Sequence, residues 1–206
     1  MLILAINGSP RPSGSTAQLL WATREVVESA GATFVFLQVS EALKELKVPY
    51  CTVCSDPCRG KCYAGTRLEE MFNLMRRSDG IIMGSPVYFS TVSSHLKSFW
   101  DRTRLLRREM ALLNVVGGAL AVGGARFGGQ ETALRAMHDM MLCQGMTVVG
   151  DGYPDVDAGH QGACAQDPVA GDAWGLQRAL ALARRVVEVA EATRELRART
   201  RKSATR

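Results

Sequence analysis

The chain has 206 residues, of which 47% are hydrophobic and 22% are charged. This composition is typical of one soluble globular domain and excludes a disordered or fibrous chain. No apolar run approaches the roughly 20 residues that a membrane helix needs, and the opening MLILAINGSPRP lacks the pattern of a signal peptide. We therefore expect a cytoplasmic protein with no membrane span.

The net charge of +5 lies at one end of the chain. Residues 194–206 hold six basic side chains and one acidic side chain, and the other 193 residues hold 19 of each. The basic isoelectric point therefore describes a tail and gives no support for nucleic-acid binding by the fold. We expect one domain over residues 1–193, followed by a solvated, frayed basic tail over residues 194–206. The tail could touch an acidic partner or a membrane surface through Arg197, Arg199, Arg201, Lys202 and Arg206.

Apolar runs and helical patterns alternate along the chain. The runs predict buried strands at 2–6, 33–39, 80–85, 115–124 and 146–150. The helical patterns lie at 16–30, 68–78, 93–107, 130–144 and 173–196. Because parallel strands need crossover helices, this alternation predicts an α/β fold with helices on both faces of the sheet. The five strands suit a flavodoxin-like, doubly wound parallel sheet of order 2-1-3-4-5.

Two predicted connections are long, at residues 40–67 and 151–172. Long loops in compact domains are usually functional or disordered. The first is dense in cysteine, and we expect it to be functional. The second is rich in Gly, Ala, Asp and Pro and carries no recognisable motif, so we assign it no role.

The loop after the first strand, residues 7–16, reads NGSPRPSGST and leads directly into a helix. Its glycines permit close backbone approach, its hydroxyls and Arg11 can donate hydrogen bonds, and the helix start offers free N–H groups. No Asp or Glu precedes Glu25, so no acid nearby in sequence would repel a phosphate. The loop lacks the glycine patterns of nucleotide triphosphatases and dinucleotide folds. It indicates a site for a phosphate monoester, the alternative being an ordinary turn with a helix cap.

The loop after the third strand contains Pro86, Val87, Tyr88 and Phe89. A stiff segment with two aromatic rings and exposed amides can support a flat heterocycle and hydrogen-bond its rim. The alternative is that both rings cap the core. The loop after the fourth strand, residues 123–130, has four glycines, which permit close approach to a ligand. A phosphate clamp beside a flat-ring platform suggests FMN.

The segments GSPRPSGST, SPVYFSTVSSHLKSFWDR and GGARFGGQET, in this order, resemble the flavodoxin-like NAD(P)H-dependent FMN reductases, in particular their iron-sulfur flavoprotein branch. The resemblance covers roughly residues 1–150. It implies FMN phosphate contacts at Ser9, Arg11, Ser13, Ser15 and Thr16. It implies contacts to the flavin ring at Pro86, Val87, Tyr88, Phe89, Gly124 and Arg126. The first loop departs from the family, which often carries Asn or Lys where this chain has Pro12, Ser13 and Ser15.

Four cysteines, Cys51, Cys54, Cys58 and Cys62, lie in the segment CTVCSDPCRGKC. In a reducing compartment such clustering favours metal ligation or redox chemistry over structural disulfides. A short, turn-rich loop with four thiolates suits a [4Fe–4S] cluster, and a structural zinc or free thiols are the alternatives. The resemblance also implies a [4Fe–4S] cluster at this place in the chain. The spacing C-x2-C-x3-C-x3-C differs from the C-x2-C-x2-C opening usual for that branch.

We interpret the chain as an FMN-dependent oxidoreductase and electron carrier, in which a [4Fe–4S] cluster passes electrons to FMN and on to small acceptors. Since the cofactor performs the chemistry, we assign no catalytic side chain, and the three histidines receive no role. One alternative is a cluster-free NAD(P)H-dependent FMN or quinone reductase, and another is a non-catalytic thiol or zinc redox sensor. If the cluster is present, one-electron transfer from a ferredoxin-like donor becomes possible. The resemblance implies a homodimer or homotetramer. We expect Cys143 to be a buried small hydrophobe.

Overall fold

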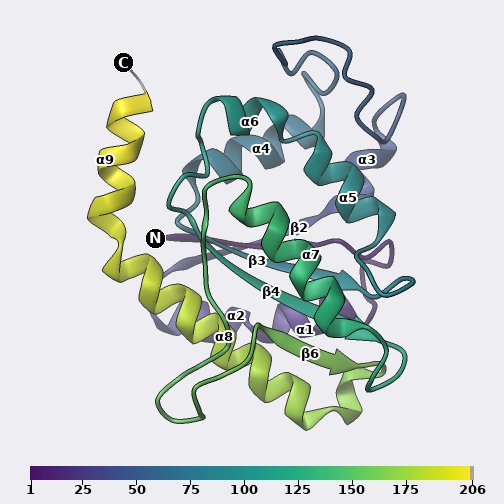
Figure 1. Ribbon diagram of the computed structural model, residues 1–206, viewed down its shortest axis with the longest axis vertical. Helices are drawn as coiled ribbons and strands as arrows, with labels where there is room; N and C mark the ends of the chain where they lie inside the picture. The colour runs from purple at the N-terminus through teal and green to yellow at the C-terminus, as the bar shows by residue number, and fades with distance from the viewer. Residues whose placement is uncertain (205–206) are drawn as a thin grey trace.

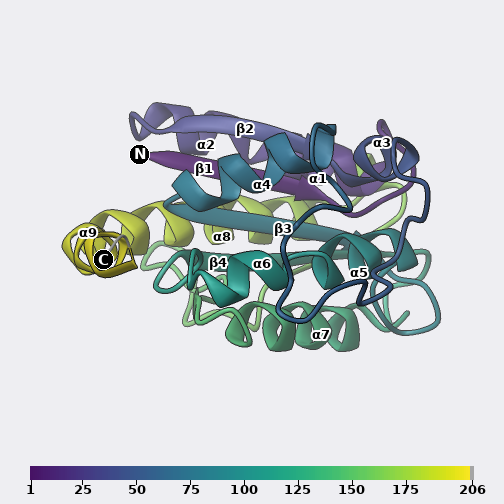
Figure 2. The same ribbon diagram turned by 90° about the horizontal axis from the view of Figure 1, so that it is seen from above.

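The structure, a computed structural model, describes the backbone of residues 1–204 and the side chains of residues 1–201. A parallel sheet forms its middle layer, and helices cover both faces (Figures 1 and 2). The strands are β1 (Leu2–Asn7), β2 (Thr33–Gln38), β3 (Gly80–Pro86), β4 (Val116–Gly123), β5 (Thr147–Val148) and β6 (Ala163–Gln166). The helices are α1 (Ser15–Ala22), α2 (Arg24–Ser29), α3 (Val39–Lys44), α4 (Arg67–Arg77), α5 (Ser94–Asp101), α6 (Arg104–Arg108), α7 (Gln130–Leu142), the 3-10 turn η1 (Val169–Gly171), α8 (Ala173–Ala192) and α9 (Arg194–Ala204).

The strands follow the order β2-β1-β3-β4-β5, and every pairing is parallel. This confirms the predicted flavodoxin-like α/β fold. In the register of the sheet, Asn7 at the end of β1 lies opposite Gln38 and Gly84. The loops that follow the strands therefore begin side by side along one edge, at the carboxyl ends of the strands.

The position beyond β4 is shared by two short strands instead of the predicted strand at 146–150. β5 pairs with the start of β4, at Val116, and β6 pairs with its end, at Leu120. The chain between them leaves the sheet and is held by the buried Arg178, which donates hydrogen bonds to Asp151 and Asp157 at 2.5 and 3.0 Å. The long connection to which the sequence assigned no role thus supplies part of the sheet.

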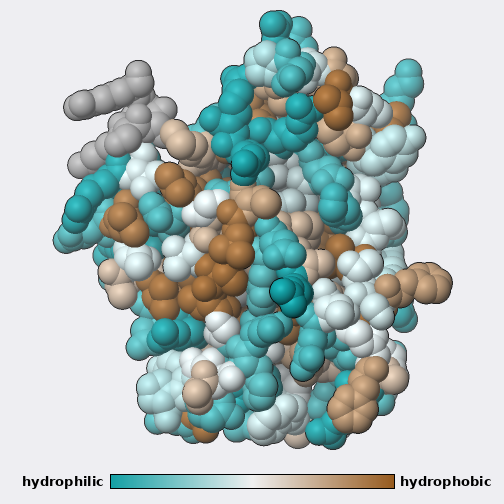
Figure 3. Space-filling model, viewed as in Figure 1, coloured by the Kyte–Doolittle hydropathy of each residue, from teal (hydrophilic) through white to brown (hydrophobic). Residues whose placement is uncertain are grey.

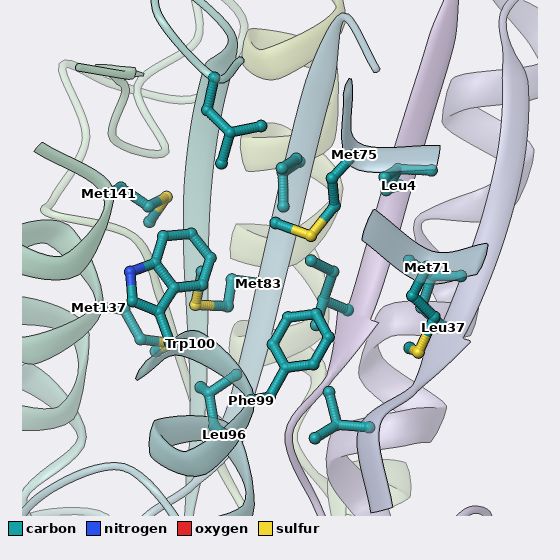
Figure 4. Packing of buried hydrophobic residues seen from close by; sticks show 14 of the residues in the cluster. Leu4, Leu37, Met71, Met75, Met83, Leu96, Phe99, Trp100, Met137 and Met141 are labelled. Carbon is teal, nitrogen blue, oxygen red and sulfur yellow. The ribbon is translucent and has the colours of Figure 1, made fainter. Parts of the chain in front are cut away.

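Apolar side chains fill a core on each side of the sheet, as expected for strands buried on both faces. Under α4, α5 and α7 the core includes Met83, Phe99 and Trp100 (Figure 4). On the opposite face, Ile3 and Leu182 belong to the core under α1, α2 and α8. Two packed layers of helices thus fix the strands and the loops at their ends.

Three predicted helices, 16–30, 93–107 and 173–196, are each broken near a threonine. The hydroxyls of Thr23, Thr103 and Thr193 donate to a backbone carbonyl three or four residues earlier, at 2.6–2.7 Å. Side-chain bonds of this kind compete with regular helix geometry, which gives each break a local physical reason. The break between α5 and α6 leaves Arg102 as the residue that ends α5. Its side chain contacts the cysteine segment that is described below.

The basic end of the chain forms α9 over residues 194–204, where we expected a frayed tail. Most of its described side chains are exposed, as expected of a solvated segment. Arg197 is 1% exposed, and its guanidinium donates to the Asp79 carboxylate at 3.3 Å and to the carbonyl of Ala190. The side chain of Lys202, and Arg206 as a whole, lie outside the described residues. Within residues 1–204, no helix has the length and apolar character needed to cross a membrane.

Candidate functional site

The loops after β1, β3 and β4 meet at the carboxyl edge of the sheet. Gly8 donates its N–H to the carbonyl of Gly84 at 2.8 Å, and Ser93 donates its hydroxyl to the carbonyl of Gly8 at 2.5 Å. A Cβ added to Gly129 would lie 2.8 Å from the backbone of Ser90. The three loops that the sequence singled out are therefore in mutual contact.

Two buried amide side chains hold the loop after β1 in place. Asn7 donates to Gln38 Oε1 at 2.6 Å and accepts the N–H of Ser9 at 3.0 Å. Gln38 in turn donates to the carbonyl of Ser9 at 2.7 Å and to the hydroxyl of Ser40 at 2.7 Å. Sequence analysis missed these positioning residues. The available signal was a polar residue ending each of two neighbouring buried strands.

The predicted phosphate contacts Ser9, Arg11, Ser13, Ser15 and Thr16 line this loop and the first turn of α1. The helix begins after Gly14, and no side chain caps its first N–H groups. The hydroxyl of the buried Thr16 makes no hydrogen bond within the part of the chain whose side chains are described. Free backbone N–H groups at a helix start, with hydroxyls beside them, suit an anion.

One acid lies against this loop, which the sequence could not reveal. Ser15 donates its hydroxyl to the carboxylate of Asp167, in the segment between β6 and η1. The sequence shows no acid near the loop before Glu25, but the fold brings one from the other end of the chain. A carboxylate here opposes the binding of an anion, because like charges repel.

The loop after β3 is a tight turn. Val87 donates its N–H to the carbonyl of Val122 at 2.8 Å, and Tyr88 and Thr91 exchange two backbone hydrogen bonds of 3.0 and 3.1 Å. Between them, Phe89 and Ser90 have φ values of 49° and 60°, a region that side-chain-bearing residues rarely adopt. This turn leaves Phe89 fully exposed and Tyr88 38% exposed, so neither ring caps the core.

The loop after β4 leaves open space beside its backbone. A Cβ on Gly124 would meet no heavy atom within 4 Å. Gln130, 4% exposed, braces the loop by donating to the carbonyl of Ala125 at 2.6 Å and accepting the N–H of Gly128 at 2.9 Å. Arg126 and Phe127 point outward as exposed side chains. Gln130 therefore holds the loop in place, and the space beside Gly124 is open to a ligand.

A pocket of about 590 Å³ lies between this loop and residues 164–174. Its walls include Arg126, Phe127, Asp167 and Trp174. Figure 3 shows apolar side chains that protrude from the rim of the molecule on the side where the strand arrows of Figure 1 end. The connection without a recognisable motif thus forms one wall of a hollow beside the loop after β4, which sequence analysis missed.

The four clustered cysteines lie in the segment between α3 and α4, which crosses α5 and α6. Cys54 and Cys62 are exposed, Cys51 and Cys58 are half-buried, and all four are free thiols. Arg102, at the end of α5, is 4% exposed and makes four hydrogen bonds to this segment. Its guanidinium donates to Cys62 Sγ at 3.0 Å and to the carbonyls of Val48, Pro49 and Tyr50. Sequence analysis missed Arg102, which had no distinguishing signal in the helix pattern.

The thiols influence one another electrostatically. Burial raises the pKa of the Cys62 thiol, the Arg102 guanidinium opposes this, and charge on Cys54, Cys58 and Cys51 raises the pKa further. Among the side chains of residues 1–201, however, no three His, Cys, Asp or Glu are grouped as metal ligands. The donor set, four free thiols with an N–H donor to one sulfur, fits an iron-sulfur cluster chemically.

The remaining cysteines differ from expectation in one respect. Cys143, which the sequence predicted to be buried, is exposed, because it caps the end of α7. Cys164 is half-buried in β6, and burial raises the pKa of its thiol to about 12.

The comparisons with known proteins identify the family of this chain. The sequence model of the family described as NADPH-dependent FMN reductase matches residues 1–161. The chain is 38% identical over 196 residues to an iron-sulfur flavoprotein of Methanocaldococcus jannaschii, covering 92% of this chain and 97% of the relative. It is 36% identical over 196 residues to an iron-sulfur flavoprotein of Methanosarcina thermophila, covering 93% and 96%.

Solved structures share the fold. A flavodoxin, WrbA-like protein of Agrobacterium tumefaciens superposes with a TM-score of 0.65 at 18% identity, over 93% of this chain and 97% of that chain. RosB, solved with the bound intermediate 8-demethyl-8-formylriboflavin-5'-phosphate, superposes with a TM-score of 0.71 at 16% identity, over 95% of this chain and 81% of that chain.

Proposed function

The chain belongs to the NADPH-dependent FMN reductase family, and from this membership we propose that it binds FMN where the three loops meet at the carboxyl edge of the sheet. As a member of the family it is a flavin-dependent oxidoreductase. We further propose that it is an electron carrier, in which the clustered cysteines would hold a [4Fe–4S] cluster that would supply single electrons for FMN and for small acceptors.

The FMN site is supported by one observation: the loop after β1, which suits a phosphate, contacts the loops after β3 and β4, which leave room for a flat ring. Ser9, Arg11, Ser13, Ser15 and Thr16, with the N–H groups at the start of α1, would hold the phosphate. Pro86, Val87, Tyr88, Phe89, Gly124 and Arg126 would border the ring, since the open space at Gly124 leaves room for it. Crevices of this kind, outside the carboxyl ends of parallel strands, are where open α/β sheets bind ligands.

When bound, FMN supplies hydride and single-electron chemistry, and the protein supplies position and electrostatics. The braced loop after β4 and the tight turn after β3 would fix the plane of the ring. Backbone N–H groups of these two loops would hydrogen-bond the flavin ring and so adjust its electronic properties. No acid or base side chain is then required. Asn7 and Gln38 would not contact FMN themselves. They hold the loop that would bind its phosphate.

Cys51, Cys54, Cys58 and Cys62 would hold the cluster. Arg102 supports this role, since its N–H donates to Cys62 Sγ while its other donors fix the start of the segment. Hydrogen bonds to cluster sulfurs are one of the means by which proteins set reduction potential.

A cluster-free NAD(P)H-dependent FMN or quinone reductase is the second candidate. It is favoured by the absence, among the described side chains, of a preformed group of three metal-binding residues. In that case NAD(P)H is the co-substrate that reduces the flavin directly. With the cluster, ferredoxin is the donor we propose. In either case we propose a homodimer or homotetramer.

An absorption spectrum of the full chain purified without oxygen, with iron, zinc and acid-labile sulfide assayed on the same sample, tests these assignments. Flavin absorption with about four iron and four sulfide per chain supports the electron carrier. Flavin without iron leaves the cluster-free reductase. Zinc without flavin would overturn the FMN site and leave the sensor.

A further inference from the structure

The structure gathers positive charge around the cysteine segment. Residues 44–67, which comprise this segment and one residue at each end, hold five basic and two acidic side chains. Residues 97–109, from within α5 to the residue after α6, hold the same numbers. Because residues 1–193 hold 19 of each, the rest of them hold nine basic and fifteen acidic side chains. The balance of charge in the sequence therefore hides a basic region, which forms only when the chain folds.

Side-chain contacts join these two stretches into one surface. Arg108 in α6 donates to the carbonyl of Cys58 at 2.9 Å, and Arg107 lines the same hollow as Cys51. Figure 2 shows the segment passing beside α5 and α6, and hydrophilic side chains gather at the top of Figure 3, where the segment and α6 lie in Figure 1. We call this the basic surface, formed by residues 44–67 and 97–109.

Most of the exposed cations on the basic surface are not neutralised by an acid. Among the described side chains, six of them have no carboxylate within 4.0 Å: Lys44, Lys47, Arg59, Lys61, Arg107 and Arg108. The four acids of the surface are all engaged. Asp56, Asp101 and Glu109 lie within 4.0 Å of Arg104, Lys97 and Arg76, and Glu45 accepts the N–H of Arg67. The surface therefore presents a positive field to the solvent.

The thiols lie inside this field. Cys54 and Cys62 are exposed, and Arg59 and Lys61 lie between Cys58 and Cys62 in the chain. A redox centre held by the four cysteines would therefore have one side at the surface, surrounded by cations. Because the rate of electron transfer falls steeply with distance, a protein that donates electrons to this centre has to dock on the basic surface.

The arrangement of the cations favours a broad partner over a small anion. The six cations without a carboxylate are all exposed and come from two separate stretches, so they do not converge on one enclosed point. Interfaces between redox proteins are small and transient, and opposite charges on the two surfaces steer the encounter. A partner with an acidic surface fits both the sign and the spread of the charge.

We propose, on the basis of the proposed function, that the basic surface docks an acidic one-electron carrier protein, with its redox centre beside Cys54 and Cys62. One electron leaves the reduced carrier, which becomes oxidised, and enters the centre that the four cysteines hold, which becomes reduced. No bond forms or breaks in this step.

The test measures binding of the full chain to an oxidised, acidic [2Fe–2S] ferredoxin of the plant type by calorimetry. We expect a dissociation constant of about 1–10 μM at about 20 mM salt, and at least about tenfold weaker binding at about 0.3 M salt, where charges are screened. Arg107→Glu should weaken binding about tenfold at low salt, because it reverses one charge of the surface. Arg184→Glu is the matched control, since it makes the same charge change on an exposed arginine of α8, on the opposite face of the sheet, and it should bind normally.

Equal loss of binding in the two variants would show that only net charge matters and would overturn the proposal. A 20-base-pair DNA duplex of mixed sequence tests the other class of polyanion. If it binds as tightly as ferredoxin and with the same dependence on Arg107, the surface does not select a carrier protein and the proposal is wrong.

Iron and acid-labile sulfide, assayed on every sample, separate this proposal from the proposed function. Binding uses the oxidised carrier and needs no electron transfer, so each can fail alone. No binding by a sample that contains iron and sulfide overturns the docking surface and leaves the cluster. Binding by a sample without iron supports the docking surface and contradicts the cluster.

Discussion

The guanidinium of Arg102 joins the two ends of the cysteine segment: it donates to Cys62 Sγ at 3.0 Å and to the carbonyl of Tyr50 at 2.8 Å. Tyr50 immediately precedes Cys51, the first of the four cysteines. One buried side chain from α5 therefore fixes the entry to the segment and its last thiol together. A planar fork with five donors can do this, and an ammonium group cannot.

We therefore expect Arg102→Lys to loosen the segment while the charge is kept. Loss of hydrogen bonds from a charged donor to the carbonyls of these half-buried and exposed residues costs about 1 kcal/mol in local stability. Limited trypsin digestion after Arg59 or Lys61 should become several-fold faster. Arg108→Lys is the matched control, because Arg108 is exposed and makes one bond to this segment, to the carbonyl of Cys58 at 2.9 Å. Equal digestion of both variants contradicts the role of Arg102.

Gly124→Val should abolish FMN binding without unfolding the chain. A side chain at this position meets no protein atom within 4 Å, but it would occupy the space that we assign to the ring. Fluorescence titration with FMN should show at least tenfold weaker binding, with an unchanged melting temperature. Ala192→Val, at an exposed position at the end of α8, is the control. Normal FMN affinity in Gly124→Val would exclude the ring from this loop.

Asp167→Asn should strengthen FMN binding. The carboxylate accepts the hydroxyl of Ser15 and places a negative charge beside the phosphate site. Removing one partly exposed like charge is worth about 1 kcal/mol at an effective dielectric constant between those of protein and water, which corresponds to about fivefold in the dissociation constant. Asp139→Asn, which removes a carboxylate from α7 away from the phosphate loop, should leave the affinity for FMN unchanged. A weaker FMN affinity in Asp167→Asn would show that the carboxylate positions the loop instead.

His138 should make stability fall on acidification. Burial lowers the pKa of His138 below its ordinary value of 6.5, and the nearby Asp139 opposes this only in part. The unfolded chain therefore takes up a proton before the folded chain does, so stability decreases as the pH falls below about 6.5 and through the lowered folded pKa. Urea unfolding at several pH values should show this slope, and His138→Gln should flatten it.

Arg197→Met should destabilise the chain more than a change elsewhere in α9. Arg197 is 1% exposed and bonded to Asp79, which also accepts the N–H of Leu2 at 2.8 Å. Removing the guanidinium leaves the Asp79 carboxylate with Arg201, at 3.5 Å, as its remaining cation and leaves the carbonyl of Ala190 without this donor, at a cost of about 1–3 kcal/mol. Arg199→Met is the control, because the side chains of Arg199 and Glu195 are 76% and 89% exposed. Equal urea midpoints for both variants would show that α9 does not stabilise the fold.

The sequence by itself determined the fold and the candidate flavin edge. Apolar runs such as 2–6 and 80–84 are typical of strands buried on both faces, and the helical patterns between them favour a parallel sheet. Since the loops after parallel strands share one edge, the order of strands and helices alone places residues as far apart as Ser9 and Gly124 at one site. The four cysteines were likewise evident from their spacing.

The tertiary structure decided what local pattern does not encode. Asp167 reaches Ser15, Arg102 reaches Cys62 and Arg197 reaches Asp79, across 152, 40 and 118 positions of the chain. Single polar contacts over such separations leave no periodicity, because they depend on how packed elements are oriented. Burial of one guanidinium turned a polar tail into a docked helix, and a threonine hydroxyl broke a helix that apolar spacing alone would have continued.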